Sequence, residues 1–185
     1  MTLMRSPFHE AVFALLAAHP ELLLVALREP LASSLGSLGE LEPTLDARPV
    51  HQAPPRPLEI QLRRRGEAKP IATIAVEIQL THDEARPAVW LVDHAERHDR
   101  LRAPAYLVVV TAHPEVAAWA AGPFAFGMIT MQPTVLTPID LLEARGVSFD
   151  PALRQRVTTC TDLDVLARWL HRAASTCVAE EVFAP

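Results

Sequence analysis

The chain has 185 residues and a formal net charge of −5, and half of its residues are hydrophobic. This length and apolar content suffice for one domain with a substantial core, and they exclude a chain that is disordered throughout. The acidic balance argues against a protein that binds nucleic acid over its whole surface, although it leaves room for a local basic groove.

Membrane and targeting segments are not expected in this sequence. The most apolar stretches, such as residues 22–27, are far shorter than the roughly 20 residues that a helix needs to cross a bilayer. His9 and Glu10 interrupt the region that would be purely apolar in a signal peptide. We therefore expect a soluble cytoplasmic protein in which Cys160 and Cys177 are ordinary thiols, because two cysteines are too few for a disulfide framework.

The first part of the chain is expected to form one helix followed by a proline-rich segment. Residues 6–28 carry a broad apolar stripe, and Ser6 followed by Pro7 is typical of a helix start. Residues 30–57 carry serine and glycine, and the part from 43 to 57 contains five prolines, which break any long helix, so the segment 30–57 is expected to be mostly loop. A short strand is expected near residues 41–50.

An alternating apolar pattern predicts a β-hairpin over residues 58–80, with its turn at 65–68. Because side chains alternate between the two faces of a strand, Glu77 and Gln79 leave the same face near the end of the second strand. A run of three arginines, residues 63–65, lies next to the turn. These arginines would either contact phosphates or form a charged turn that protects a sheet edge.

The second half of the chain is expected to alternate helices with strands. Asp83 can cap a helix that runs to about Leu101, and the continuous apolar run 106–110 is typical of a central strand buried on both faces. The remaining elements are a helix at 114–121, a strand at 134–136, and helices at 138–145 and about 161–178. This order predicts one mixed α/β domain over residues 1–185, with helices on both faces of a mixed central sheet.

The polar end of the second hairpin strand is the best candidate for a functional site. Glu77 and Gln79 follow an otherwise apolar strand, which is the local arrangement that a divalent ion needs at a sheet edge. Mg²⁺ prefers carboxylate and carbonyl oxygens, with water in the remaining positions. A second acid must come from another segment, and Glu59 on the first hairpin strand has the parity to share a face with Glu77.

Four segments together resemble a known family: residues 6–10, 58–80, 101–111 and 113–120. They are similar to the PD-(D/E)xK nuclease superfamily, and within it to a bacterial branch related to recombination-promoting nucleases and transposase-like proteins. The resemblance extends from the first helix to about residue 140. It implies a restriction-endonuclease-like core.

The resemblance also implies a function and roles for particular residues. The expected activity is hydrolysis of DNA phosphodiester bonds with Mg²⁺ or Mn²⁺. The second family motif, acid-x-Lys, is matched by residues 77–79 in a Glu-x-Gln form, so Glu77 would be a metal ligand and Gln79 would take the position of the lysine. Glu59 would be the first acid and a second metal ligand, and Glu10 would add an outer metal contact.

The chain departs from the family pattern in two ways, which support a second hypothesis. The segment that should supply the first acid, residues 56–60, contains no aspartate, which leaves Glu59 or, less directly, Asp46. Gln79 cannot supply the positive charge of the lysine. The second hypothesis is a catalytically degenerate nuclease-fold domain that binds a protein partner or assembles into a homo-oligomer.

Other residues permit both a functional and a plain interpretation. His94 and His98 are four residues apart on a predicted helix, with His82 upstream, which is a spacing that can bind zinc. The same helix carries Asp93, Glu96, Arg97, Asp99 and Arg100, which favours a solvated helix face over a zinc site. The absence of GxGxxG disfavours a nucleotide-cofactor enzyme. Three tryptophans are expected to pack in the core or at an interface: Trp90, Trp119 and Trp169.

Overall fold

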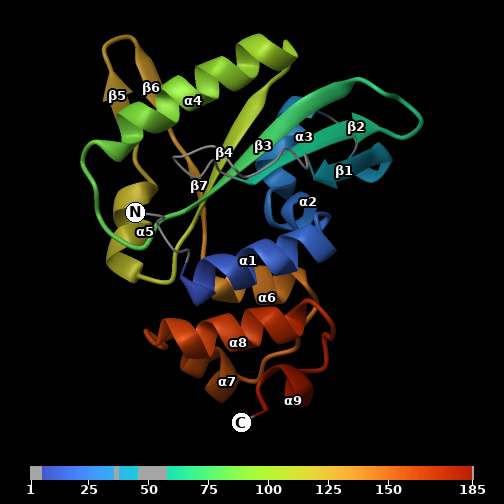
Figure 1. Ribbon diagram of the computed structural model, residues 1–185, viewed down its shortest axis with the longest axis vertical. Helices are drawn as coiled ribbons and strands as arrows, with labels where there is room; N and C mark the ends of the chain where they lie inside the picture. Colours follow the sequence, from blue (N-terminus) through green and yellow to red (C-terminus); the bar gives the residue numbers. More distant parts are fainter. Residues whose placement is uncertain (1–5, 36–37, 46–57, 185) are drawn as a thin grey trace. The chain divides into compact units, whose positions relative to one another are not determined.

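The computed structural model (Figure 1) describes residues 6–35, 38–45 and 58–184. The chain divides into two compact units: a helical unit, residues 1–28 and 136–185, and a sheet unit, residues 29–135. None of the helices in the described ranges is both long and apolar enough to span a lipid bilayer.

The helical unit is built from two helices that follow the N-terminus and four from the second half of the chain. Helix α1 packs along α8, and α2 packs on α6. The helices are α1 (Pro7–Ala18), α2 (Leu22–Ala26), α6 (Pro138–Ala144), α7 (Pro151–Thr158), α8 (Leu163–Ala173) and α9 (Ala179–Val182).

Helix α1 begins as predicted but ends earlier. The Ser6 side chain accepts a hydrogen bond from the His9 amide, and Pro7 lies in the first turn. The prediction of one helix to residue 28 is wrong, because Pro20 interrupts it: proline cannot donate the hydrogen bond that continues a helix. His19 at the break lies with Nε2 2.8 Å from the carbonyl oxygen of Ala174, which ties the end of α1 to the end of α8.

The core of the helical unit includes Trp169, as predicted. This side chain is 3% exposed and packs edge-on against Phe183, with ring centroids 5.1 Å apart. The expected helix at 161–178 is shorter, since α8 begins after the Asp162 cap and ends at Ala173. Helix α7 was not predicted, although Asp150 caps it by accepting from the Leu153 amide at 2.7 Å.

The sheet unit contains a mixed five-stranded sheet with strand order β1-β2-β3-β4-β7. Strands β1, β2 and β3 run antiparallel in turn, and β4 is parallel to β3. The strands are β1 (Leu41–Leu45), β2 (Leu58–Arg64), β3 (Pro70–Ile78), β4 (Ala105–Val110) and β7 (Thr134–Leu136). The other elements are α3 (Arg28–Leu35), the 3-10 helix η1 (Leu38–Glu40), α4 (Arg86–Leu101), α5 (Pro114–Ala120), and a small hairpin of β5 (Phe124–Phe126) and β6 (Ile129–Met131).

The predicted hairpin is confirmed as β2 and β3. Its turn contains Gly66, whose φ of +80° is a backbone conformation that glycine adopts without strain. The predicted strands at 106–110 and 134–136 are confirmed as β4 and β7. The strand expected near residues 41–50 is β1, and the rest of the proline-rich segment, from residue 46 to residue 57, lies outside the described residues.

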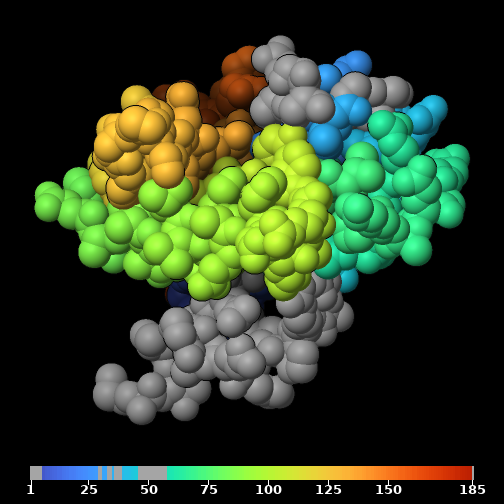
Figure 2. Space-filling model, turned by 90° about the horizontal axis from the view of Figure 1, so that it is seen from above, coloured from blue at the N-terminus to red at the C-terminus, as the bar shows by residue number. Residues whose placement is uncertain are grey.

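One face of the sheet is covered by α4, α5 and the β5–β6 hairpin. Trp90 from α4 is buried among side chains from β3, β4, α5 and β6, and it contacts Trp119 and Phe124 with centroid distances of 5.6 and 6.0 Å. The outer surface of α4 lies between the β5–β6 hairpin and the β2–β3 hairpin (Figure 2). The core prediction for Trp90 is therefore confirmed, and Trp119 is half-buried in the same cluster.

Three features of the sheet unit differ from the predictions. Asp83 does not cap α4: its carboxylate accepts from the Ala85 amide at 3.0 Å, and the helix starts at Arg86 without a side-chain cap. Helix α3 occupies part of a segment that was expected to be loop. The β5–β6 hairpin was not predicted, because its strands have only three residues each and show too little alternation.

Candidate functional site

Glu59 and Glu77 lie on the same face of the sheet. In the β2–β3 register Glu59 is opposite Ala75, and Ala75 is two residues before Glu77. Diagonal neighbours of this kind are about 7–8 Å apart. The parity predicted for these two acids is confirmed, and they share the face that carries Ala75, which packs in the cluster around Trp90 on α4.

Glu77 is a buried carboxylate with an arginine partner. It is 5% exposed, and its Oε2 accepts a hydrogen bond of 2.7 Å from Nη2 of Arg86, the first residue of α4. Burial raises the pKa of Glu77, and the nearby charge of Arg86 opposes this without cancelling it. The geometry supports an ion pair in which desolvation of the carboxylate is only partly compensated.

Glu59 is held by two arginines from the other end of α4. Nη2 of Arg100 lies 2.8 Å from both carboxylate oxygens of Glu59. Nε of Arg97 lies 3.6 Å from Oε2 of the same residue, and Nη2 of Arg97 is 3.9 Å from Asp93. Both acids predicted to bind a metal are thus paired with guanidinium groups.

The arginines come from one face of α4, which was expected to be solvated. Arg97 is only 9% exposed, so the interpretation of this charged helix face as solvated is wrong for that residue. The positions of these residues along the helix indicate that they share one face. Residues 86, 90, 93, 97 and 100 recur at i, i+4, i+7, i+11 and i+14, which is one stripe of an α-helix. Trp90 in the middle of the stripe marks it as the face turned toward the sheet.

Gln79 directly follows β3, and it donates hydrogen bonds to two backbone carbonyl groups. Its backbone nitrogen donates to the Val110 carbonyl at 3.0 Å, which continues the pairing of β3 with β4. Its side-chain Nε2 donates to the Thr81 carbonyl at 2.7 Å, and the residue is 8% exposed. This contact braces the turn that leaves the strand.

The arrangement does not fit a Mg²⁺ or Mn²⁺ site of the kind that the resemblance implies. Such an ion needs several oxygen ligands, whereas Glu59 and Glu77 already accept from arginines, whose positive charges repel a cation. Within the described ranges, no group of three or more histidine, cysteine, aspartate or glutamate side chains is placed to hold a metal ion. Asp46, the other candidate for the first acid, lies outside those ranges.

Glu10 belongs to the helical unit, whereas Glu59, Glu77 and Gln79 belong to the sheet unit. It is an exposed residue in the first turn of α1, where an acid is favoured by the helix dipole. It lines a shallow cavity between α1 and α8. Its predicted role as an outer metal contact stays a prediction.

Of the three histidines considered for zinc, His98 and His82 contact different residues. Nδ1 of His98 lies 2.9 Å from the Ala103 carbonyl, at the end of α4. His82 stacks on Trp119 with ring centroids 4.7 Å apart. Burial lowers the pKa of His94, and neighbouring positive charge lowers this pKa further.

The arginines next to the hairpin turn have partners on the neighbouring strand and the 3-10 helix before it. Arg64 and Arg65 pair with Glu40 and Glu42, at 3.3 and 3.2 Å. Arg63 donates to Thr44 and to Gln61. These contacts favour the interpretation of a charged turn over that of a phosphate-binding run.

Comparisons with known proteins give no relative for this chain: no family model matches it, and neither the curated proteins nor the solved structures contain a match.

Proposed function

We propose that this chain is a non-catalytic domain with a restriction-endonuclease-like fold that acts by contact with proteins. The observation that carries the proposal is the pairing of both candidate metal ligands, Glu59 and Glu77, with arginines of α4. A mixed sheet with an acidic strand end agrees with the fold that the resemblance implies. The proposal places the chain in the cytoplasm, in keeping with its two free thiols.

Charge neutralisation at this site supports a structural role for its residues. Three carboxylates (Glu59, Glu77 and Asp93) face three guanidinium groups (Arg86, Arg97 and Arg100), so the cluster has no excess charge to offer a ligand. Phosphate binding depends on cations that are free to replace counterions. The arginine pairs therefore favour a role in fastening α4 to the sheet.

The second candidate is a DNA nuclease dependent on Mg²⁺ or Mn²⁺. The placement of Glu59 and Glu77 on one face, with Gln79 next along the strand, favours it. For this function the arginines would have to leave the carboxylates when the ion binds. The two candidates therefore make opposite predictions for metal-dependent cleavage.

Plasmid cleavage distinguishes them. We expect the purified wild-type chain with Mn²⁺ to cleave supercoiled plasmid no faster than the Glu77→Ala variant, because neither would hold the ion. Glu96→Ala is the matched control, since it removes an exposed acid from α4. Cleavage by the wild type and by Glu96→Ala that falls at least about 100-fold in Glu77→Ala would overturn the proposal, since loss of a metal ligand removes most of the charge stabilisation.

A further inference from the structure

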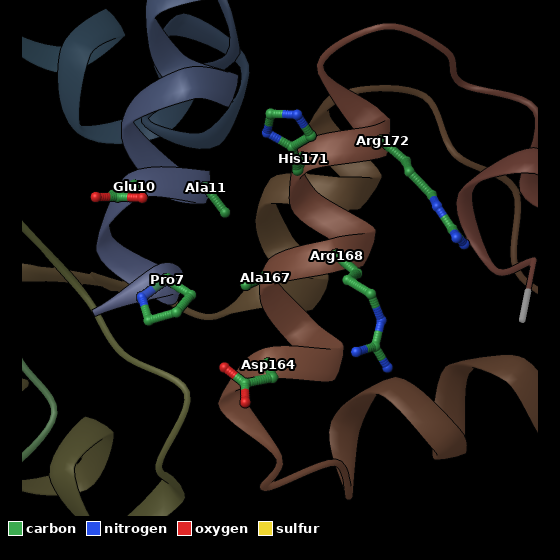
Figure 3. Close-up of a pocket in the computed structure, with 8 residues that line it drawn as sticks. All are labelled: Pro7, Glu10, Ala11, Asp164, Ala167, Arg168, His171 and Arg172. Atoms are coloured by element: carbon green, nitrogen blue, oxygen red, sulfur yellow. The ribbon is translucent and has the colours of Figure 1, made fainter. Parts of the chain in front are cut away.

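A groove runs between α1 and α8 in the helical unit. It is shallow, with a volume of about 440 Å³, and Ala11 and Ala167 lie between the two helices (Figure 3). Ala11 and Ala167 are 3% and 6% exposed, so these short side chains are buried in the contact between the two helices.

The two sides of the groove carry opposite charge. Glu10 extends from α1 on one side, and Arg168 extends from α8 on the other, each pointing away from the opposing helix (Figure 3). Both are exposed, and neither forms an ion pair or a side-chain hydrogen bond with any residue that the structure describes. Their charges are therefore available to a partner.

We propose that this groove is the contact surface for a second copy of this chain. The inference rests on the proposed function and names the protein partner. In a two-fold contact the same patch meets itself, so it must be self-complementary. A two-fold axis that runs along the groove places the acidic side of one copy over the basic side of the other, which brings Glu10 opposite the second copy's Arg168.

The ends of the groove agree with this arrangement. Pro7 and Asp164 lie on opposite sides of one end of the groove, and His171 lies at the other (Figure 3). The same axis brings Asp164 over the second copy's Pro7, at the start of its α1. Negative charge is favourable there because the N-terminus of a helix carries partial positive charge.

A partner whose charges all have the same sign fits this surface less well. Nucleic acid would gain from Arg168 and His171 but would be repelled by Glu10 and Asp164, which line the same cavity. A basic peptide would meet the reverse conflict. The mixed charge of the groove thus favours its own copy.

Charge reversal with exchange tests the contact. In Glu10→Arg the contact would face arginine with arginine, and in Arg168→Glu it would face acid with acid, so each variant alone should weaken the dimer at least about tenfold. An equimolar mixture of the two variants should restore it, since both contacts of the mixed dimer again join opposite charges. The double variant Glu10→Arg/Arg168→Glu should also dimerise, with the pair exchanged.

Sedimentation velocity of the full chain over a micromolar concentration series measures these dimers. The matched controls are Glu96→Arg and Lys69→Glu, exposed residues of the sheet unit that should leave the wild-type dimer unchanged. A monomeric wild type, or a dimer that neither single variant weakens, would overturn the inference. Metal-dependent plasmid cleavage would overturn the proposed function instead, so the two failures are distinguished.

Discussion

Arg86→Ala is expected to lower the free energy of unfolding by about 3 kcal/mol at neutral pH, since removal of one partner leaves the other as an unpaired buried charge. Glu77 keeps little access to water, with its side chain 7% exposed against 30% for Arg86. Urea unfolding followed by tryptophan fluorescence measures the difference. Arg102→Ala is the matched control: its pair with Asp99 is highly exposed, so its loss should cost no more than about 0.5 kcal/mol.

The pH dependence of this defect identifies its cause. The native pKa of Glu77 is raised above its usual 4.5, so its protonated form favours the folded state below about that pH, and this contribution is lost as pH rises through the native pKa. Arg86→Ala removes two influences that lower the pKa, and it raises the pKa further. The deficit should therefore grow with pH and shrink on acidification. In the Glu77→Gln background, the loss of stability caused by Arg86→Ala should not depend on pH. In the wild-type background, a loss that is equal at every pH would contradict the buried-charge explanation.

Trp90→Ala is expected to cost about 3–5 kcal/mol, the usual range for removal of a buried tryptophan. Trp90 is 1% exposed and contacts two aromatic rings, Trp119 of α5 and Phe124 of β5, so its removal opens a cavity where α4 meets both elements. Equilibrium unfolding by circular dichroism measures the loss. Val92→Ala on the same helix is the control, because a side chain that is 57% exposed should change stability by no more than about 0.5 kcal/mol.

The same substitution tests whether Trp90 positions the arginines. Since it lies in the stripe between Arg86 and Arg97, loss of its packing should also weaken the ion pairs with Glu77 and Glu59. The deficits of Trp90→Ala and Arg86→Ala should then be less than additive. Strict additivity, or a loss below about 1 kcal/mol for Trp90→Ala, would contradict the anchoring role.

The part of the site that follows from local pattern could be predicted from the sequence. Alternation along residues 58–80 identified both hairpin strands, and side-chain parity placed Glu59 and Glu77 on one face. A short hairpin fixes its own register through its turn, so nearby residues contain the needed information. The buried strand β4 was recovered from its continuous apolar run.

The partners of those acids could not be assigned in this way. Arg100 is 41 residues away from Glu59 in sequence, and nothing local shows which helix face meets which strand. Charge was taken to mean exposure, although arginine can be buried when its guanidinium group is paired. Only the helical stripe that includes Trp90 could have indicated that Arg97 turns inward.

Two helices, α1 and α7, were predicted incorrectly because single residues decide where a helix ends or begins. Pro20 ended α1 in the middle of an apolar stripe that otherwise continued, so a helix was predicted too long. Asp150 followed by Pro151 is a helix start that was overlooked, and α7 was missed. These errors leave the sheet face of Glu59 and Glu77 unaffected.

Isothermal titration of the wild-type chain with Mn²⁺ tests most directly whether arginines, rather than a metal ion, are the partners of the two acids. We predict no saturable site that depends on them, so that the wild type and Glu59→Gln/Glu77→Gln take up Mn²⁺ alike. A single stoichiometric site that is present in the wild type and in the exposed-acid control Glu96→Gln, but absent from the double variant, would contradict the proposed function.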